Sequence, residues 1–300
     1  MSIVFHFDGT EALRQRLEPL GVTLCPENDE AAFERLVPEM EVLWHVLKPV
    51  TAAVIARAPK LRLIQKIGIG VNTIDLEAAK RRGIAVCNLP GSNSRAVAEM
   101  TLLLMLACLR RLPQLNDLVR SDHGWYKSWE LQDAFGELGG RTVGLVGYGA
   151  VPQILHPVLE ALGAKVLFWS RSRRNAAYEE LLVVSDIVSL HLPLTAQTQR
   201  ILDVRKLKRG AILINTARGG LVDEEAVVQA LQDGTLSAAG LDVFAEEPGR
   251  PDHPLLRHKN VVAAPHLAWL TGETLQRSIE AALRNVNKMR TGVSLENRVA

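Results

Sequence analysis

The amino-acid sequence predicts an α/β protein with two doubly wound parallel-sheet domains. Short apolar runs alternate with amphipathic stretches over most of the 300 residues, and the runs fall into two series. Strands that alternate with helices need crossover connections, which favour a parallel sheet with helices on both faces. A chain of this length is also about twice the usual domain size of roughly 150 residues.

The elements of each series follow from this periodicity. In the first series we expect strands at 2–7, 22–25, 42–46, 62–67 and 84–87, with helices between them, for example at 51–56 and 76–81. The second series predicts strands at 142–147, 165–169, 186–190, 211–215, 238–243 and 261–263. Residues 272–290 have helical spacing and can return to the first domain.

Two unusual segments separate the series. Residues 96–111 are apolar on nearly every face, which predicts a helix buried where two domains meet, although an ordinary core helix shows the same pattern. Residues 113–140 are polar but contain Trp125, Tyr126 and Trp129. This segment is too irregular for a sheet and too aromatic for a plain linker, so it predicts an arm that packs against another subunit.

Composition argues against several classes of function. The chain has 35 Lys and Arg against 33 Asp and Glu, and its basic residues form short pairs, which disfavours nucleic acid as a partner. The longest apolar run, 102–109, is far shorter than the ~20 residues of a membrane span, and the first ten residues do not resemble a signal peptide. Cys25, Cys87 and Cys108 lack metal-binding spacing, so we expect small core residues in a cytoplasmic protein and no metal site.

A glycine-rich turn follows the first strand of the second series. Residues 141–150 read RTVGLVGYGA, and a helical pattern comes next. In a dinucleotide-binding turn the first glycine permits the bend and the second lets a pyrophosphate approach the backbone. Gly147 and Gly149 therefore predict a dinucleotide site, although any strand-turn-helix corner can carry a GxG pattern.

The next strand ends without the acidic residue that would bind ribose hydroxyls and repel a 2′-phosphate. Ser170 and Arg171 stand at that position, and Arg173 and Arg174 follow. A hydroxyl and guanidinium groups suit a phosphate dianion. The sequence thus predicts a preference for NADP, with NAD as the second choice, although a solvated loop would also carry exposed arginines.

Three later strands each end in a short polar sequence. The strand predicted at 211–215 precedes Arg218, and the next two strands precede Glu247 and His266. In an open parallel sheet, the carboxyl ends lie at one edge, beside a bound cofactor. Taken singly, these residues could be a surface cation, a loop charge and a helix cap.

Together the three residues supply what reduction of a carbonyl by a nicotinamide requires. Arg218 can bind and polarise the carbonyl oxygen, and His266 can deliver a proton as hydride arrives. A carboxylate at Glu247 stabilises the protonated imidazole near pH 7.

With these segments in place, the chain resembles the D-isomer-specific 2-hydroxyacid dehydrogenase family from about residue 61 to residue 266. The further motifs are GIGVNTID at 68–75, NLPGSN at 88–93 with Val97, Ala98 and Glu99 after it, and HLPLT at 191–195. The segments of Arg218, Asp242, Glu247 and His266 follow in the order and approximate spacing of the family's Arg, Glu and His triad.

The resemblance implies roles toward the substrate. Arg218 would bind its carboxylate and keto oxygen, His266 would be the acid/base and Glu247 would pair with it. Backbone N–H groups near Ile69 and Gly70 would also bind the carboxylate, because a glycine-rich turn can approach an anion closely.

It implies cofactor contacts as well. Asp242 would hold the nicotinamide carboxamide, and Thr101 would lie near the nicotinamide. Gly147, Gly149, Ala150 and Val151 would lie near the pyrophosphate. The remaining expected contacts are His191, Pro193, Thr198, Thr216 and Ala217.

The family's architecture implies a flavodoxin-like substrate domain with a Rossmann-like cofactor domain inserted into it. We expect the substrate domain at 1–92 and 268–300, the cofactor domain at 93–267, and catalysis in the cleft between them. The resemblance also implies a homodimer built through the arm at about 113–140, with Trp129 as the candidate to reach the partner's active site.

Three residues depart from the family pattern or from helical propensity. Pro152 replaces the third glycine of the turn, which leaves the turn intact but removes a close packing contact. Pro157 should bend or loosen the same helix. Trp269 stands where many members have small residues, so it either narrows the pocket toward small substrates, which we favour, or packs between the domains.

The sequence favours an NADP(H)-preferring reductase of small 2-keto acids, glyoxylate or hydroxypyruvate first, that yields the D-2-hydroxy acid. A phosphite-type dehydrogenase on the same scaffold is one alternative, but it should prefer NAD and an acidic residue in place of Ser170. A formate dehydrogenase would pair the histidine with glutamine and not with Glu247. A nicotinamide-sensing interaction protein is the alternative from another class, and it would bind the cofactor without useful turnover.

Overall fold

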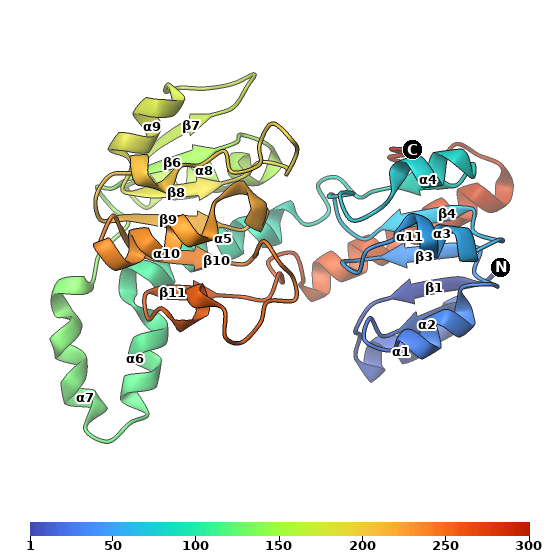
Figure 1. Cartoon of the computed structure of the whole chain (residues 1–300), viewed down its shortest axis with the longest axis horizontal. Helices are drawn as coiled ribbons and strands as arrows, with labels where there is room; N and C mark the ends of the chain where they lie inside the picture. The colour runs from blue at the N-terminus through green and yellow to red at the C-terminus, as the bar shows by residue number, and fades with distance from the viewer. The chain divides into compact units, whose positions relative to one another are not determined.

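The computed structural model describes residues 1–300, which divide into two compact units (Figure 1). Unit 1 consists of Met1–Asn93 and Thr271–Ala300, and unit 2 consists of Ser94–Leu270. Each unit contains one sheet in which all paired strands are parallel. The predicted α/β class with two doubly wound sheets is confirmed.

The sheet of unit 1 has the strand order β2-β1-β3-β4-β5. This is the flavodoxin-like order that the family resemblance implies. Each predicted run of the first series contains one strand of the sheet. The strands are β1 (Ile3–His6), β2 (Val22–Cys25), β3 (Val42–His45), β4 (Leu63–Lys66) and β5 (Ala85–Cys87).

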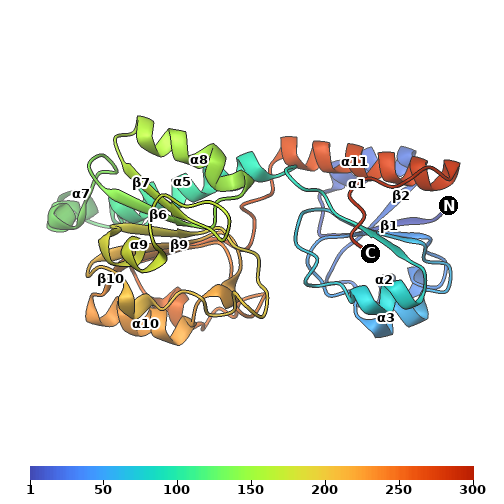
Figure 2. The same ribbon diagram turned by 90° about the horizontal axis from the view of Figure 1, so that it is seen from above.

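Helices cover both faces of this sheet, with α1 and α11 on one face and α2 and α3 on the other (Figure 2). Side chains of Thr10, Asp29, Thr51 and Asp75 cap the first four α-helices by accepting a backbone N–H group of the first turn. The helices are α1 (Glu11–Leu17), η1 (Glu18–Leu20), α2 (Glu30–Leu36), α3 (Ala52–Arg57), α4 (Leu76–Arg81) and α11 (Gly272–Thr291).

The C-terminal segment completes unit 1. Val299 donates a backbone hydrogen bond to Val86 of β5, and Val86 donates one to Ala300. Beneath this contact, the buried Asn285 of α11 donates to the Gln65 side chain of β4 over 2.7 Å. Residues 271–300 therefore supply both a covering helix and an edge contact to a sheet formed by residues 1–93.

The sheet of unit 2 has the strand order β11-β10-β9-β8-β6-β7. The chain leaves β6 for β7 on one side and continues to β8 on the other, so β6 and β8 flank a topological switch point, where α/β sheets bind ligands. The Rossmann-type arrangement is thus confirmed, with β7 and β11 as the edge strands. The strands are β6 (Thr142–Val146), β7 (Lys165–Trp169), β8 (Ile187–Leu190), β9 (Ala211–Asn215), β10 (Leu236–Leu241) and β11 (Val261–Ala263).

In unit 2, α5 and α8 cover one face of the sheet and α9 and α10 cover the other (Figure 2). Two hydrophobic cores, one on each face, hold these helices against the strands. The elements are α5 (Ser94–Arg110), α8 (Ala150–Ala161), α9 (Tyr178–Val184), η3 (Val204–Lys206), η4 (Gly219–Leu221), α10 (Glu224–Asp233) and η5 (Pro254–Arg257). None of the helices combines the length and hydropathy that a membrane span requires.

Helix α5 packs one side against the sheet, as an ordinary core helix does, and a position where two domains meet remains a prediction. Leu104 and Cys108 pack on the sheet, where a Cβ atom on Gly240 would lie 3.0 Å from the Leu104 Cβ. Leu103 and Leu106 face away and are 52% and 37% exposed. The sheet can cover only one side of the helix, and the apolar residues of the other side remain accessible.

The polar segment after α5 forms a helical arm that projects from unit 2 (Figure 1). It contains α6 (Leu112–Val119), α7 (Gly124–Lys127) and η2 (Ser128–Ala134), none of which its irregular pattern predicts. Trp125, Tyr126 and Trp129 are 70%, 76% and 71% exposed. At the base of the arm, the Gln114 side chain donates to the Lys259 carbonyl over 2.6 Å, which anchors α6 to unit 2.

The three cysteines are buried and form no disulfide, as predicted for small core residues. Burial raises the pKa of the Cys108 thiol to about 12. This thiol is therefore protonated and unreactive at neutral pH.

Two buried histidines lie side by side at the carboxyl edge of the unit 1 sheet. His6 of β1 is the Cα partner of His45 of β3, and the His6 ring stacks on Phe33 with 4.0 Å between the ring centroids. The Nε2 atom of His6 has no hydrogen-bond partner. Burial, aided by the charge of Lys48, lowers the pKa of His6 to about 4, so the ring is neutral at pH 7.

We expect the chain to lose stability in mild acid because of His6. An unfolded histidine has a pKa of about 6.5, so the unfolded chain binds more protons than the folded chain once the pH falls below that value. Between pH 7.5 and pH 5 the His6 contribution to the free energy of unfolding should fall by about 2 kcal/mol. Urea unfolding of His6→Leu should show that much less acid loss, whereas the exposed control His123→Asn should behave as wild type. An equal acid loss in wild type and His6→Leu would contradict the assignment.

Candidate active site

One row of residues in register marks the carboxyl edge of the unit 2 sheet. Each member is the Cα partner of its neighbour on the adjacent strand. From β11 to β7 the row is Ala263, Leu241, Asn215, Leu190, Val146 and Trp169. Most of the residues that the sequence predicts for the site follow this row within a few positions, so the sheet brings them to one edge.

His266 and Glu247 form an ion pair at this edge. The Nδ1 atom of His266 lies 2.5 Å from Oε2 of Glu247, and Oε1 of Glu247 accepts the Phe244 backbone N–H over 2.9 Å. Burial acts to raise the pKa of Glu247, but the hydrogen bond and charge of His266 lower it overall. Glu247 is therefore ionised at neutral pH, and Nε2 of His266 is left to exchange a proton.

Asp242 fixes the backbone around His266. Its two carboxylate oxygens accept the N–H groups of Leu267 and Ala268 over 2.9 and 3.0 Å, and the His266 N–H donates to the Asp242 carbonyl over 2.7 Å. These bonds hold His266 at a φ of 57°, a conformation that non-glycine residues rarely adopt. Burial raises the pKa of the Asp242 carboxyl. The contact with the nicotinamide carboxamide that the family resemblance implies for Asp242 stays a prediction.

Arg218 follows β9 in a tightly bonded turn. The Asn215 side chain accepts the Ala217 N–H over 3.0 Å and donates to the Arg218 carbonyl over 2.9 Å. The next residue, Gly219, packs so closely that a Cβ atom would lie 2.0 Å from the carbonyl carbon of Phe244. This contact joins the Arg218 turn to the loop that carries Glu247, and the charge of Arg218 helps to lower the pKa of Glu247.

No role was predicted for Asn215, although its side-chain amide bonds to the Arg218 turn at both ends. The available signal was an amide residue at the last position of the predicted strand, three residues before the arginine. An asparagine there can bond its own backbone two residues on and so shape a turn.

The turn after β6 has the geometry of a nucleotide cradle. Gly147 has a φ of 101°, and a Cβ atom there would lie 2.3 Å from the His191 carbonyl oxygen. A Cβ atom on Gly149 would meet nothing within 4 Å, so the backbone is open on that side. The residues present therefore fit a pyrophosphate at Gly149.

Helix α8 begins at this open turn. The N-cap residue Gly149 makes no side-chain hydrogen bond, and the Gln153 N–H donates to the Gly149 carbonyl. The N–H groups of Ala150 and Val151, which precede Gln153 in the first turn, therefore have no partner inside the helix. Pro152 is buried in this first turn, where its missing N–H costs little. The helix continues through Pro157 to Ala161, and the Gln153 carbonyl that loses a donor there is on an exposed residue.

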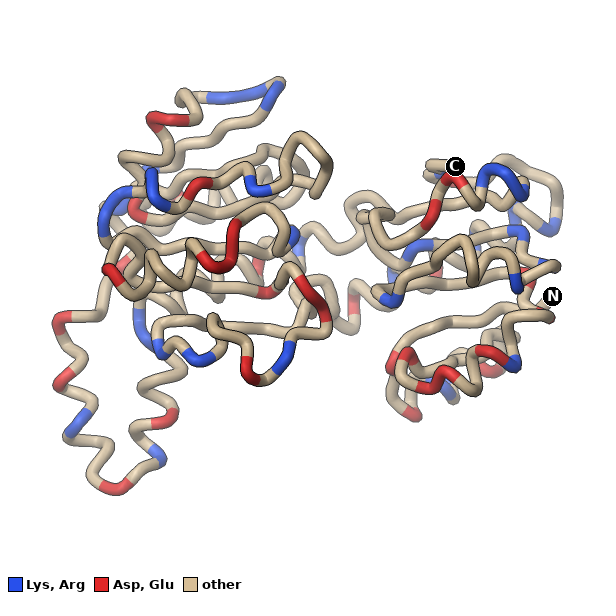
Figure 3. The backbone as a smooth tube through the Cα atoms, in the orientation of Figure 1, with Lys and Arg blue, Asp and Glu red and all other residues tan.

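The basic residues after β7 form a tight turn at the tip of unit 2 (Figure 3). Ser170 Oγ donates to the Arg173 carbonyl over 2.7 Å and accepts the Arg173 N–H over 3.0 Å. The single hydroxyl hydrogen of Ser170 is thus used within the turn. The turn lines a pocket of about 440 Å³ formed by Phe168, Arg171, Ser172, Arg173 and Arg174.

The other residues that we expect to bind the cofactor form two groups that are held by hydrogen bonds. Thr101 of α5 donates to the Val97 carbonyl, and its Oγ1 lies 2.9 Å from that of Thr216, beside Ala217. Thr198 donates to the Pro193 carbonyl over 2.6 Å and so shapes the loop after β8. In the same loop, burial lowers the pKa of His191 to about 4, so this imidazole is neutral at pH 7.

The substrate residues expected in unit 1 lie in the loop after β4. Gly68 has a φ of 144°, and the exposed Ile69 offers its carbonyl to the Asn88 side chain over 2.9 Å. The roles of Ile69 and Gly70 toward a carboxylate remain predictions. The same holds for Trp269 of unit 2, which is 7% exposed.

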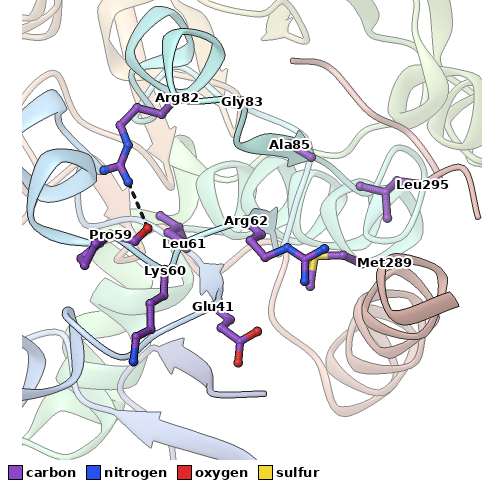
Figure 4. Close-up of a pocket in the computed structure, with 10 residues that line it drawn as sticks. All are labelled: Glu41, Pro59, Lys60, Leu61, Arg62, Arg82, Gly83, Ala85, Met289 and Leu295. Carbon is purple, nitrogen blue, oxygen red and sulfur yellow. Dashed lines mark hydrogen bonds between the residues drawn. The ribbon is translucent and has the colours of Figure 1, made fainter. Parts of the chain in front are cut away.

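A second pocket, of about 610 Å³, lies in unit 1 (Figure 4). Its lining includes Glu41, Arg62 and Ala85, which precede or begin strands, so it belongs to the amino edge of that sheet. Figure 4 shows Arg62 directed toward Met289, whereas Arg82 points to Pro59, whose carbonyl accepts its hydrogen bond. The two guanidinium groups do not converge on one ligand.

A parallel sheet with a glycine turn at its switch point and an acid/base pair at the same edge defines a nucleotide-binding α/β enzyme. Residues 102–268 match the family model of the D-isomer specific 2-hydroxyacid dehydrogenase, NAD binding domain. The chain is 39% identical to a glyoxylate reductase of Aeropyrum pernix over 83% of this chain and 79% of the relative. It belongs to the D-isomer-specific 2-hydroxyacid dehydrogenase family and is an NAD(P)-dependent oxidoreductase.

Two further relatives show the breadth of the similarity. A D-3-phosphoglycerate dehydrogenase of Archaeoglobus fulgidus is 36% identical over 88% of this chain but only 52% of its own length. The crystal structure of the TT0316 protein from Thermus thermophilus matches with a TM-score of 0.88 and 36% identity over the whole of both chains.

The two glycines of the turn should respond differently to alanine. Gly147→Ala should lower the free energy of unfolding by ~2 kcal/mol or more, because its Cβ atom would clash with the His191 carbonyl at an unfavourable φ. Gly149→Ala should leave the melting temperature within 2 °C or so of wild type, because the space there is open. The added methyl group would nevertheless weaken NADPH binding by about tenfold or more. Normal NADPH binding by Gly149→Ala in a fluorescence titration would show that the pyrophosphate lies elsewhere.

Proposed function

We propose that the chain is an NADP(H)-preferring reductase of small 2-keto acids, with glyoxylate or hydroxypyruvate as the first candidates and the D-2-hydroxy acid as product. The observation that carries this proposal is the His266–Glu247 ion pair beside Arg218, on the sheet edge that also holds the open glycine turn. The similarity to glyoxylate reductases supports the substrate class.

The proposed reaction uses each of the three side chains once. The guanidinium of Arg218 binds the substrate's carboxylate and keto oxygen and polarises the carbonyl. The reduced nicotinamide, when bound, supplies hydride to the keto carbon. His266 gives the proton on Nε2 to the keto oxygen as that oxygen gains charge, and the Glu247 carboxylate on Nδ1 stabilises the imidazolium before the transfer.

The proposed cofactor preference rests on the turn after β7. Arg171 and Arg173 line the pocket there and can donate charge-assisted hydrogen bonds to a 2′-phosphate. Ser170 stands where NAD-preferring enzymes place a carboxylate. We further propose that Asp242 contacts the nicotinamide carboxamide through the second lone pair on each of its oxygens.

We also propose that the protein forms a homodimer and is located in the cytoplasm. The exposed Trp125, Tyr126 and Trp129 give the arm an aromatic surface of the kind that is enriched at subunit interfaces. The buried, unpaired cysteines suit a reducing compartment.

The direct test is oxidation of NADPH and NADH, followed at 340 nm, with glyoxylate, hydroxypyruvate, pyruvate and phenylpyruvate. We expect turnover with at least one small 2-keto acid, faster with NADPH. Phosphite oxidation with NAD in place of these reactions would favour the alternative dehydrogenase. Cofactor binding without turnover of any substrate would favour a sensing protein.

Arg218→Lys should reduce kcat/KM for the keto acid by about 100-fold or more, because an ammonium cannot reproduce the two-pronged contact of a guanidinium. NADPH binding should stay within about twofold of wild type, since the substitution leaves the glycine turn unchanged. The exposed Arg205→Lys is the matched control and should keep full activity. Unchanged turnover by Arg218→Lys would remove Arg218 from the site.

Ser170→Asp should shift cofactor preference toward NADH. An aspartate there can still accept the Arg173 N–H, and the backbone N–H of residue 170 still donates to the Arg173 carbonyl, although the hydrogen bond from the hydroxyl to that carbonyl is lost. The charge of the aspartate would repel a 2′-phosphate by about 1–2 kcal/mol. The ratio of kcat/KM for NADPH to that for NADH should therefore fall by roughly tenfold. Ser294→Asp, which adds the same charge in unit 1, should not change this ratio. If Ser170→Asp leaves the ratio unchanged as well, the ribose pocket has been assigned to the wrong turn.

A further inference from the structure

The residue between the two glycines of the turn, Tyr148, supports the basic turn after β7. Its ring stacks on Phe168 of β7, with centroids 3.8 Å apart and an angle of 19° between the planes. Phe168 in turn lines the pocket with Arg171 and Arg173. The stacked pair therefore links the glycine turn to the turn that we propose binds the 2′-phosphate.

A hydrogen bond to His156 holds the Tyr148 ring in place. Its hydroxyl lies 2.6 Å from Nδ1 of His156, and Nε2 of His156 lies 3.3 Å from the Glu160 carboxylate. In the tautomer protonated on Nε2, which the nearby Glu160 carboxylate favours, Nδ1 of His156 accepts the Tyr148 hydroxyl hydrogen. Both partners are on α8, so the ring is anchored to the helix that begins at the same turn.

Arg173 lies over the Tyr148 ring, with its guanidinium carbon 5.1 Å from the ring centroid. Such a contact uses the flat face of the guanidinium and leaves the N–H groups at its edge free to bind an anion. The backbone of Arg173 is fixed separately, because both its N–H and its carbonyl bond to Ser170. Both ends of this arginine are therefore held before any ligand binds.

We propose that Tyr148 is a positioning residue for Arg173 and through it determines the preference for NADP(H) over NAD(H). The inference rests on the proposed NADP(H) preference and names the side chain that makes it effective. A free arginine loses much rotamer freedom when it binds a phosphate, whereas an arginine already held on a ring loses less. NAD(H) lacks the 2′-phosphate and gains nothing from this arrangement.

The test measures the Kd of NADPH and of NADH by fluorescence titration of wild type, Tyr148→Leu, Arg173→Ala and the double variant. Tyr148→Leu should weaken NADPH binding by about five- to tenfold and change NADH binding by less than about twofold. In the Arg173→Ala background, Tyr148→Leu should cause no further loss of discrimination, because the two residues act together. Tyr148→Phe keeps the ring and should keep most of the discrimination.

Each alternative result has a distinct meaning. Equal affinity of the wild type for NADPH and NADH would overturn both the proposed preference and the role of Tyr148. A wild-type preference that is lost in Arg173→Ala but kept in Tyr148→Leu would overturn the role of Tyr148 alone. Equal weakening of both cofactors by Tyr148→Leu would make Tyr148 a structural part of the glycine turn and would also overturn its role in specificity. If Tyr148→Leu does not fold, Tyr148→Met, which places a flexible apolar side chain there without an aromatic face, has the same expected outcome.

Discussion

Backbone hydrogen bonds between parallel strands fix the register of the unit 2 sheet, and this register decides which side chains meet at its carboxyl edge. Leu190 is paired with both Val146 and Asn215, so the glycine turn and the Arg218 turn begin at the same height. A shift of one residue in β9 would move Arg218 by ~3.3 Å and reverse the faces of the strand. The buried apolar residues on both faces oppose such a shift, so the packing of the core also fixes the geometry of the site.

The charges at this edge are kept by burial and by specific partners. Asp242, Glu247 and Arg218 lie close to His266 or to one another, and burial alone would favour the neutral forms of these three groups. Glu247 stays ionised because a backbone N–H and an imidazole both bond to it. Asp242 performs a different task, because its oxygens bond to the backbone and hold His266 in an unfavourable conformation. Glu247 thus bonds to the imidazole ring of His266, whereas Asp242 holds the backbone around it.

Most of the sheet could be predicted from the sequence, whereas the arm and the exact hydrogen bonds could not. Buried strands such as 211–215 are continuous apolar runs, and their polar ends identify the site edge. The helices of the arm, in contrast, are short and depend on local features, such as Gly124, where an added Cβ atom would clash with the Leu118 carbonyl. Periodicity cannot reveal that Ser170 uses its hydrogen on Arg173 or that Tyr148 stacks on Phe168, because these contacts depend on how two turns approach each other in space.

The discontinuity of unit 1 has a consequence for the order in which the molecule is made. A ribosome completes β1 to β5 first, but the helix and edge contact that cover this sheet lie beyond unit 2, after residue 270. Gln65 and one face of β4 therefore stay uncovered until about 180 further residues have been synthesised. At the usual rate of translation this takes on the order of ten seconds or more. Unit 2 is one continuous segment and can fold during that interval. Residues 271–300 complete unit 1 last. A chain that is released after residue 270 therefore contains a complete unit 2 joined to an incomplete unit 1.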